Sequence, residues 1–203
     1  MLQCKAVLTD GCGSIFVDTV EVDPPQIDEV LVQIKAAGVC HTDHKYMFRG
    51  IPRILGHEGA GVVVDVGPGV THVKPGDRVM LNWATNCGEC FQCQRGNHSL
   101  CESRQHPPLE RTRYTGAGIE RAFYLGAMCS YTVVAKQAVN KLDVDISFAA
   151  ACVIGCAVMT GYGSVVNAAK VQPGSSVAVI AAGGVGLNIF KLRASRVRPG
   201  SLP

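Results

Sequence analysis

Four cysteines stand close together in the stretch NCGECFQCQRGNHSLC. Two residues separate each of the first three, and seven residues separate the third from the fourth: Cys87, Cys90, Cys93 and Cys101. Two-residue gaps let neighbouring thiolates turn onto one ion, and four thiolates complete a tetrahedral zinc shell that leaves no position for a substrate. The spacing therefore predicts a structural zinc site.

An iron–sulfur cluster is the main alternative for this array, because ferredoxins also use a CxxCxxC spacing. Their fourth cysteine follows after three residues and precedes a proline, whereas Cys101 follows after seven residues and precedes Glu102. Four thiols without a metal would be open to oxidation in such a polar loop. We therefore interpret the array as zinc-binding, and four thiolates on one zinc ion make the loaded chain less positive than its formal charge of +3.

A second set of possible metal ligands is spread along the chain. Cys40 stands in GVCHTDHKY, His57 in GHEGAG and Cys156 in GCAVMTGYG. Two thiolates and one imidazole form a zinc site whose fourth position stays open for water or a substrate, as catalytic zinc requires. Each residue alone is more typical of a buried cysteine or of a hydrogen-bonded core histidine.

These motifs occur together in one known family. The four-cysteine array, CHTD, GHEGAGVVVDVG, GDRV, GCAVMTGYG and AGGVG have the order and approximate spacing of the zinc-dependent medium-chain alcohol dehydrogenases, which the sequence resembles up to about Phe190. The resemblance implies two zinc ions per chain, one catalytic and one structural, with NAD or NADP in full-length members. Zinc-free quinone reductases of the same superfamily are disfavoured, because all seven zinc ligands have a match here.

The resemblance implies roles for residues at matching positions. Cys40, His57 and Cys156 match the catalytic zinc ligands, and Glu58 matches a glutamate close behind the metal. Asp43 matches the carboxylate that orients the zinc-bound histidine, with a turn-capping aspartate as its alternative.

Proton release and cofactor contact are implied in the same way. Thr42 matches the hydroxyl that takes the alcohol's proton and passes it through the cofactor ribose to a histidine. Lys45 stands where that histidine is common and His44 precedes it, so the end of the relay stays open. His41 matches a position that contacts the cofactor pyrophosphate, and an ordinary surface histidine is its alternative.

A glycine-rich turn follows the apolar run SVAVIAA, which we interpret as a buried strand that leads into a helix. Gly183 and Gly186 match the second and third glycines of the dinucleotide fingerprint, and Ala181 replaces the first. The predicted cofactor-binding residues are Gly183, Gly184, Val185 and Gly186. An acidic residue that holds the ribose is expected about 20 residues later, and the sequence reaches Pro203 without a credible candidate.

The last residues, KLRASRVRPGSLP, depart from the alanine-rich helix and GASRIIAVD that are common in the family. DNA that encodes VRPGSLP can encode ASRIIA in a shifted frame. We therefore hypothesise a frameshift or a truncated gene model after about Phe190, and we expect the chain to be inactive alone. The downstream coding DNA tests this hypothesis.

The elements that position these residues are predicted from the pattern of the chain. Short β-branched runs from residue 5 to 79, punctuated by DPP, GPG and KPGD, indicate a small antiparallel barrel or partly open sheet. Residues 82–127 lack a sustained period and are predicted to form a loop with its own anchor. A helix is expected from Ala149, with Ser147 as its cap, and RVRPGSLP is expected to form a tail.

With the resemblance, the expected fold is mixed α and β in two parts. Residues 1–157 are predicted to form a chaperonin-10-like (GroES-like) β-barrel catalytic domain that carries the structural-zinc loop 82–127. Residues 158–203 are predicted to form a connecting helix and an incomplete Rossmann-type βα unit.

Composition excludes several other classes of protein. The chain has 47% hydrophobic and 17% charged residues, no run of five like charges and no run of eighteen apolar residues. No nucleic-acid or membrane partner is therefore expected. Ten cysteines without a secretory signal indicate reduced thiols and a cytoplasmic protein.

The predicted function is NAD(P)-linked oxidation of a small-molecule alcohol to an aldehyde or ketone. The alternative is a non-catalytic zinc-binding module or interaction domain. A homo-oligomer is expected for a full-length form, and the oligomeric state of this chain, the alcohol and the choice of NAD or NADP stay open.

Overall fold

The computed structural model describes residues 1–104 and 106–197. The chain divides into two compact units, Met1–Gly155 and Cys156–Pro203. The domain boundary predicted from sequence, after residue 157, lies close to this division.

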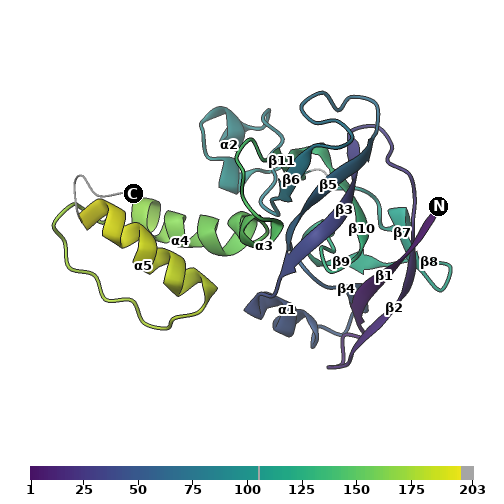
Figure 1. The fold of residues 1–203 in the computed structure, drawn as a ribbon, viewed down its shortest axis with the longest axis horizontal. Helices are drawn as coiled ribbons and strands as arrows, with labels where there is room; N and C mark the ends of the chain where they lie inside the picture. Colours follow the sequence, from purple (N-terminus) through teal and green to yellow (C-terminus); the bar gives the residue numbers. More distant parts are fainter. Residues whose placement is uncertain (105, 198–203) are drawn as a thin grey trace. The chain divides into compact units, whose positions relative to one another are not determined.

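The first unit contains two β-sheets (Figure 1). The six-stranded sheet has the order β8-β7-β2-β1-β4-β9, with β1 Leu2–Thr9, β2 Ile15–Val22, β4 Arg53–Ile54, β7 Thr112–Tyr114, β8 Ala117–Gly118 and β9 Glu120–Arg121. The five-stranded sheet has the order β10-β3-β5-β6-β11, with β3 Glu29–Gly38, β5 Glu58–Val66, β6 Arg78–Leu81, β10 Tyr131–Ala135 and β11 Val139–Lys141. Apart from the parallel pair β4 and β9, neighbouring strands run antiparallel, so the predicted antiparallel architecture of the first eighty residues is confirmed.

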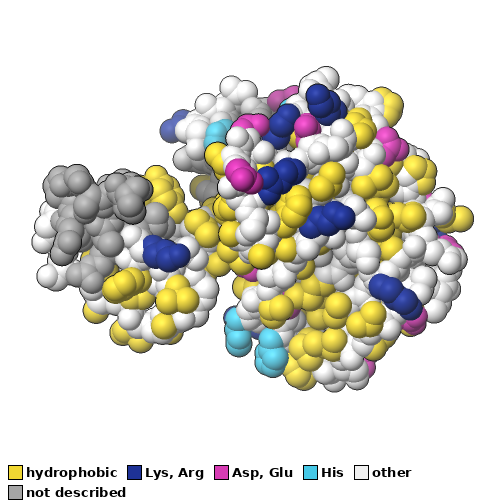
Figure 2. Space-filling view, in the orientation of Figure 1, with side chains coloured by type: hydrophobic (Ala, Val, Ile, Leu, Met, Phe, Trp, Pro, Cys, Tyr) yellow, Lys and Arg dark blue, Asp and Glu magenta, His cyan; other side chains and the backbone are white. Residues whose placement is uncertain are grey.

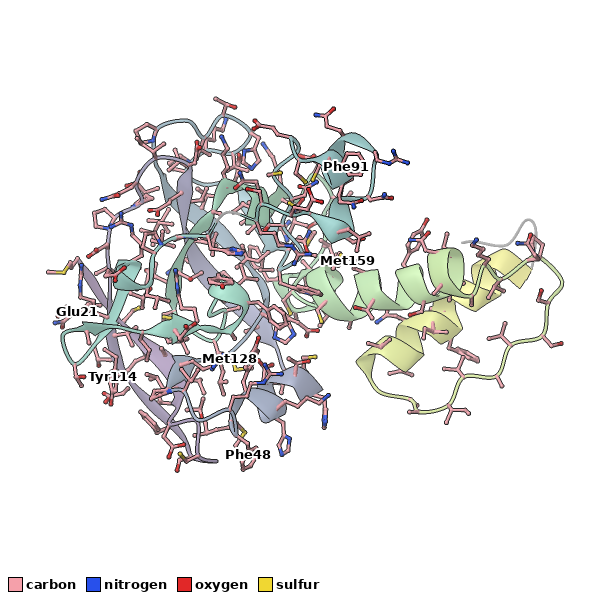
Figure 3. The ribbon with its side chains drawn as sticks, turned by 180° about the vertical axis from the view of Figure 1, so that it is seen from behind. Glu21, Phe48, Phe91, Tyr114, Met128 and Met159 are labelled. Atoms are coloured by element: carbon pink, nitrogen blue, oxygen red, sulfur yellow. The ribbon has the colours of Figure 1, made fainter. Side chains whose placement is uncertain are left out.

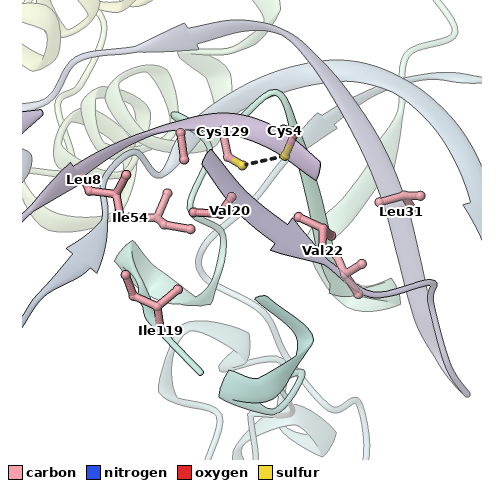
Figure 4. Packing of buried hydrophobic residues seen from close by; sticks show 10 residues of the cluster. Cys4, Leu8, Val20, Val22, Leu31, Ile54, Ile119 and Cys129 are labelled. Carbon is pink, nitrogen blue, oxygen red and sulfur yellow. Dashed lines mark hydrogen bonds between the residues drawn. The ribbon is translucent and has the colours of Figure 1, made fainter. Parts of the chain in front are cut away.

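Apolar side chains on the inner faces of these strands form the core. Along β1, the side chains of Cys4, Ala6 and Leu8 are buried, the alternation expected for a strand with one face inward. Figure 4 shows them with the other members of the first cluster, which include Val20, Val22 and Ile54. A second cluster lies on the other sheet and includes Val30, Val32, Val63, Val79 and Leu81.

The described part of residues 82–127, predicted as a loop with its own anchor, also contains three short strands that were not predicted. Strands β7, β8 and β9 arise within it and join the sheet of β1 and β2, where Glu21 pairs with Arg113 and Val22 with Thr112. Arg113 also donates two hydrogen bonds, of 2.7 and 2.9 Å, to Asp23. These strands are two or three residues long, too short to produce a period in the sequence. Pairing stabilises them: β7 pairs with β2, β8 with β7 and β9 with β4.

The described residues of the first unit include three short α-helices besides several 3-10 turns. The α-helices are α1 His41–Tyr46, α2 Phe91–Gln94 and α3 Phe148–Ala151. The predicted cap of the third is confirmed, because the Ser147 hydroxyl accepts a hydrogen bond of 3.2 Å from the Ala150 amide. The helix begins at Phe148, one residue before the predicted start, and α3 packs against β3 and β5.

Helical structure continues after α3 over Ile154–Val158, α4 Met159–Gly163 and Ser164–Ala168. By length and composition, Phe148–Ala168 could cross a membrane: its most apolar window has a mean hydropathy of 1.7. The structure buries 39% of that window, and a core helix passes the same test. The expected absence of a membrane partner stays a prediction.

The second unit contains α5 Gly184–Val197, the helix predicted after the glycine turn. The strand predicted for SVAVIAA is wrong: residues 176–182 form no strand, and Ile180 is 94% exposed. A parallel strand needs neighbouring strands that pair with its backbone, and the described residues of this unit contain none. Helix α5 includes the start of the predicted tail, and residues 198–203 lie outside the described residues.

Candidate metal centres

The four cysteines of the array form one compact cluster. Their Sγ atoms all lie within 4.8 Å of one another, and those of Cys87 and Cys93 are 4.0 Å apart. Zinc–sulfur bonds of about 2.3 Å in a tetrahedron place the sulfurs about 3.8 Å from each other. The donor set therefore fits a single zinc ion.

Backbone amides from the same loop point at these sulfurs. The amides of Cys87, Cys90 and Glu102 donate to the Sγ atoms of Cys101, Cys87 and Cys90 at 3.3, 3.3 and 3.5 Å. The Glu102 amide is the main reason that the pKa of Cys90 falls to about 6. Burial and the neighbouring thiols raise the pKa of Cys93 to about 12, so full ionisation of the cluster needs a cation.

Pairing of β3 with β5 creates the second group of possible ligands. Gly38, at the end of β3, pairs with Glu58, at the start of β5. Cys40 follows β3 and His57 precedes β5. Ligand atoms of Cys40, His57 and Glu58 therefore lie within 4.8 Å of one another. The pairing of β3 with β5 thus brings Cys40 and His57 together in space, although they are separated in the sequence.

Asp43, on α1, holds this group together and is only 3% exposed. Its carboxylate accepts hydrogen bonds from the amides of Cys40 at 3.0 Å and Gly56 at 3.1 Å. Nδ1 of His57 lies 3.3 Å from the Asp43 Oδ1 atom. The carboxylate therefore caps the start of α1 and also orients the imidazole, which leaves Nε2 as the nitrogen for a metal.

The local electrostatics favour charged forms of both ligands. Burial alone would lower the pKa of His57, but Asp43 and then Cys40 outweigh it and raise this pKa above its ordinary value. Burial alone would raise the pKa of Cys40, but hydrogen bonds from Thr42 and His57 outweigh it and lower this pKa. Both shifts favour the charged forms, and a cation can replace the proton of the pair.

Two glycines leave the space that these side chains occupy. A Cβ atom on Gly38 would overlap the carboxylate of Glu58, which is buried behind Cys40 and His57. Gly56 has a φ of +92°, and a Cβ there would overlap the backbone of Met128. Gly56 therefore requires glycine, whereas a side chain at Gly38 would force the Glu58 side chain to move.

Phe123 packs against the site and was not predicted from sequence. Its ring centroid lies 4.9 Å from that of His57 and 4.8 Å from that of Trp83. Phe123 and Tyr124 both adopt left-handed backbone, with φ of 50° and 60°, a costly conformation that recurs at functional sites. No spacing signal marks this aromatic pair, because it lies in the region that lacks a period.

A cavity of about 620 Å³ opens beside Cys40 within the first unit. Its lining includes Cys40, His41, Asp43, His44 and Met128, the last of which is labelled in Figure 3. The volume suits a small-molecule ligand. Its polar groups lie at one end, at the start of α1.

Helix α1 carries three further predicted residues. Thr42 is half-buried, and His41 and His44 are exposed with ring centroids 5.5 Å apart. Figure 2 shows histidine side chains on the surface near the position of α1 in Figure 1. Both imidazoles can therefore exchange protons with solvent.

Cys156, the third predicted ligand of the open site, is the first residue of the second unit. The chain that leads to it is fixed within the first unit. Burial is the main reason that the pKa of Cys152 is raised, and the charge of nearby Glu58 raises it further. A Cβ atom on Gly155 would overlap the carbonyl oxygen of Leu81, at the end of β6. Cys156 follows this glycine directly in the chain, so the Cα atoms of Gly155 and Cys156 are about 3.8 Å apart.

The predicted cofactor turn lies at the start of α5. Gly184, Val185 and Gly186 are in its first turn, and Gly183 precedes it. Ala181, at the first-glycine position, has a φ of +76°, the left-handed conformation for which the family uses glycine. A Cβ atom on Gly186 would overlap the Ala181 carbonyl, so the turn is tight. The sequence of the second unit contains no Asp or Glu to hold a ribose.

A family model described as the alcohol dehydrogenase GroES-like domain matches residues 26–145. The chain is 39% identical over 184 residues to alcohol dehydrogenase B of Mycobacterium tuberculosis, with 84% of this chain and 49% of the relative covered. It is 42% identical over 186 residues to S-(hydroxymethyl)glutathione dehydrogenase of Escherichia coli, with 85% of this chain and 50% of the relative covered.

The fold is also similar to solved structures. An alcohol dehydrogenase zinc-binding domain protein from Burkholderia ambifaria superposes with a TM-score of 0.85 and 28% identity, covering 96% of this chain and 56% of that chain. The chain therefore spans about half the length of the curated relatives it matches.

Proposed function

Because the chain belongs to the alcohol dehydrogenase GroES-like domain family, and with it to the zinc-dependent medium-chain alcohol dehydrogenases, we propose that it is the zinc-binding part of an NAD(P)-linked alcohol dehydrogenase. The observation that carries this proposal is the group of Cys40, His57 and Glu58 around the Asp43 carboxylate, beside a cavity of ligand size. The substrate is a small-molecule alcohol, or the corresponding aldehyde or ketone in reverse.

Two zinc sites are proposed, with different tasks. Cys40, Nε2 of His57 and Cys156 would hold the catalytic ion, and Glu58 would serve as a replacement ligand during ligand exchange. The cysteine array holds the second ion as a structural anchor: Cys87, Cys90, Cys93 and Cys101. A zinc ion with an open position supplies Lewis-acid activation of an alcohol hydroxyl.

The chain's own residues bind, orient and move the proton. Asp43 keeps the His57 imidazole in one tautomer. The Thr42 hydroxyl accepts the proton that the alcohol loses, and exposed His44 passes it to solvent. His41 and the turn of Gly183–Gly186 would bind the cofactor pyrophosphate, and bound NAD(P) would supply the hydride acceptor.

Binding of NAD(P) needs more than this turn. A dinucleotide site forms at the carboxyl ends of parallel strands, and residues 176–182 form no strand here. We propose that residues 1–203 alone bind zinc without turning over an alcohol. A non-catalytic zinc-binding module is the second candidate function. The exposed apolar run around Ile180 favours it.

A cytoplasmic location completes the proposal. All ten cysteines lie in the described residues, and none forms a disulfide, as in a reducing compartment. For a full-length form we propose a homo-oligomer, as the resemblance to the family implies.

Cobalt substitution tests the open position directly. With Co²⁺ in place of zinc, we expect thiolate-to-cobalt bands that shift when a small alcohol or imidazole is added. Cys40→Ala should remove the shift, while Cys90→Ala, in the closed site, should leave it. Thiolate-to-cobalt bands that do not shift with any added ligand would refute a catalytic role for this site.

Turnover can be tested by joining residues 1–175 to the cofactor-binding half of the matched Escherichia coli relative. Alcohol-dependent NAD reduction is expected from the fusion, with kcat lowered at least about 100-fold in Thr42→Val. A fusion that binds zinc and NAD but oxidises none of a panel of primary, aromatic and glutathione-linked alcohols would favour the non-catalytic module.

A further inference from the structure

Two cysteines outside both metal-binding groups lie together in the core of the first unit. Cys4 is on β1, and Cys129 stands just before β10. Their Sγ atoms are 3.5 Å apart, although 125 residues separate them in sequence. Figure 4 shows the contact as a dashed line within the apolar cluster. Both side chains are buried, at 8% and 5% exposure.

Backbone register places the two sulfurs side by side. Cys129 forms an isolated antiparallel bridge with Ala6. Hydrogen bonds of 2.8 and 2.9 Å hold the flanking residues, from Val7 N to Met128 O and from Ser130 N to Lys5 O. Residues two apart on a strand share a face, so Cys4 and Ala6 present their side chains to the same side as Cys129. The proximity of the thiols is thus built into the fold.

The two thiols are chemically different. A hydrogen bond from Cys129 lowers the pKa of Cys4 to about 7, against the opposing effect of burial. The same contact, followed by burial, raises the pKa of Cys129. Because the thiolate is the nucleophile in thiol oxidation, the lowered pKa favours Cys4 as the attacking sulfur and Cys129 as the thiol that resolves the product.

A route from solvent reaches Cys129, and the Cys4 sulfur lies 3.5 Å from the Cys129 sulfur. Cys129 lines an open cavity of about 370 Å³, with Lys5 and Lys35 also in its wall. This volume holds many molecules of the size of hydrogen peroxide, since water occupies about 30 Å³ in the liquid. A small neutral oxidant can therefore enter this cavity, whereas the disulfide bond of another protein is too large to enter it.

We propose that Cys4 and Cys129 are a peroxide-responsive pair that forms a disulfide bond between β1 and the segment preceding β10. The Cys4 thiolate attacks one peroxide oxygen, the O–O bond breaks, and hydroxide leaves and takes up a proton. Cys129 then attacks the sulfur of the Cys4 sulfenic acid, the S–S bond forms, the S–O bond breaks, and the proton of Cys129 leaves with the oxygen as water. Two thiols are oxidised and one peroxide is reduced to two water molecules.

The bond would act on stability and on the neighbouring site. It would close a long loop and tie the N-terminal strand to the core, which restricts the unfolded chain. Sulfur atoms in a disulfide are about 2.05 Å apart, so Cys129 must move toward Cys4. Met128, its neighbour, lines the cavity beside Cys40 and would move with it.

The test uses the zinc-loaded chain and one equivalent of hydrogen peroxide. Remaining thiols are alkylated in denaturant, and the digest is mapped by mass spectrometry with and without dithiothreitol. A reducible peptide pair that joins Cys4 to Cys129, and a raised midpoint of thermal unfolding, are expected. Alkylation of both cysteines after the peroxide is consumed would overturn the proposal.

Single variants identify the attacking sulfur. In Cys129→Ser, dimedone should trap a sulfenic acid on Cys4, whereas in Cys4→Ser no adduct is expected on Cys129 and peroxide consumption should be about tenfold slower. Cys12→Ser is the matched control, because Cys12 is exposed and its loss should leave the linkage intact. A Cys12→Ser chain that no longer forms the linkage would contradict the assignment. The wild-type map decides the main proposal even if a core variant fails to fold.

Discussion

The two candidate zinc sites differ in how the fold assembles them. The cysteine array lies within residues 87–101, and amides of the same loop and of Glu102 point at its sulfurs. The group at Cys40 instead depends on the pairing of β3 with β5 and on the Asp43 carboxylate. We call the cysteine array the local site, because its spacing alone indicates it, and we expect it to need its metal for order. We call the group at Cys40 the assembled site, because we expect the sheet to hold it before any metal binds.

The largest effect is expected from removing the local metal. Cys93→Ala should release one zinc ion and lower the free energy of unfolding by about 4 kcal/mol or more, as losses of structural metals do. The assembled site should keep its ion, because its strands do not depend on the loop. Urea unfolding and elemental analysis measure the two effects. Loss of both ions in this variant would show that the sites are not independent.

Asp43→Asn tests whether the assembled site depends on its orienting carboxylate. The amide cannot accept the same charge-assisted hydrogen bond from His57, so zinc affinity there should fall about 10- to 100-fold. Competition with a chromophoric chelator measures this affinity. Asp65→Asn, an exposed carboxylate on β5, is the matched control. Equal affinities in the two variants would contradict the role of Asp43.

Gly38→Ala probes the space in which Glu58 lies. The added methyl would overlap the Glu58 carboxylate, and we expect a loss of about 1–3 kcal/mol in the free energy of unfolding. Gly163→Ala adds the same methyl to α4, where a Cβ atom meets nothing within 4 Å. It should be neutral or slightly stabilising. If both changes have the same effect in urea unfolding, the packing argument at Gly38 is wrong.

The smallest effect concerns pH and the metal-free chain. The folded-state pKa of His57 is raised, so its stabilising contribution is complete below the unfolded pKa of about 6.5. That contribution is lost as the pH rises through the folded pKa. Urea titrations of the EDTA-treated chain should show this decline, and His57→Gln should remove it. A decline that persists in His57→Gln would assign the effect to other groups.

The same contrast explains what could be predicted from the sequence. The antiparallel strands and the Ser147 cap were predicted correctly, because period and turn chemistry are local signals. The GroES-like domain was expected from the resemblance to the family, and the family model confirms it. Strands β7–β9 were missed because pairing with other strands, not their own sequence, stabilises them: β7 pairs with β2, β8 with β7 and β9 with β4. The strand over 176–182 was predicted wrongly because its apolar pattern is only half of the requirement, and its pairing partners are missing from the described residues.

The candidate sites follow the same division. Spacing indicated the cysteine array. Ligand types suggested Cys40, His57 and Cys156, and the resemblance joined them into one site and supplied Asp43 and Glu58. The left-handed backbone at Phe123 and the contact of its ring with His57 carry no sequence signal, because they depend on tertiary packing. The close approach of Cys4 to Cys129 was equally hidden, since register across two chain segments produces it.

Zinc counting by elemental analysis tests the central claim, that one chain holds a local and an assembled zinc site. The account predicts two zinc ions in the wild type, one in Cys40→Ala, one in Cys90→Ala and none in the double variant. A wild-type chain that binds a single ion, or a Cys40→Ala chain that retains two, would contradict it.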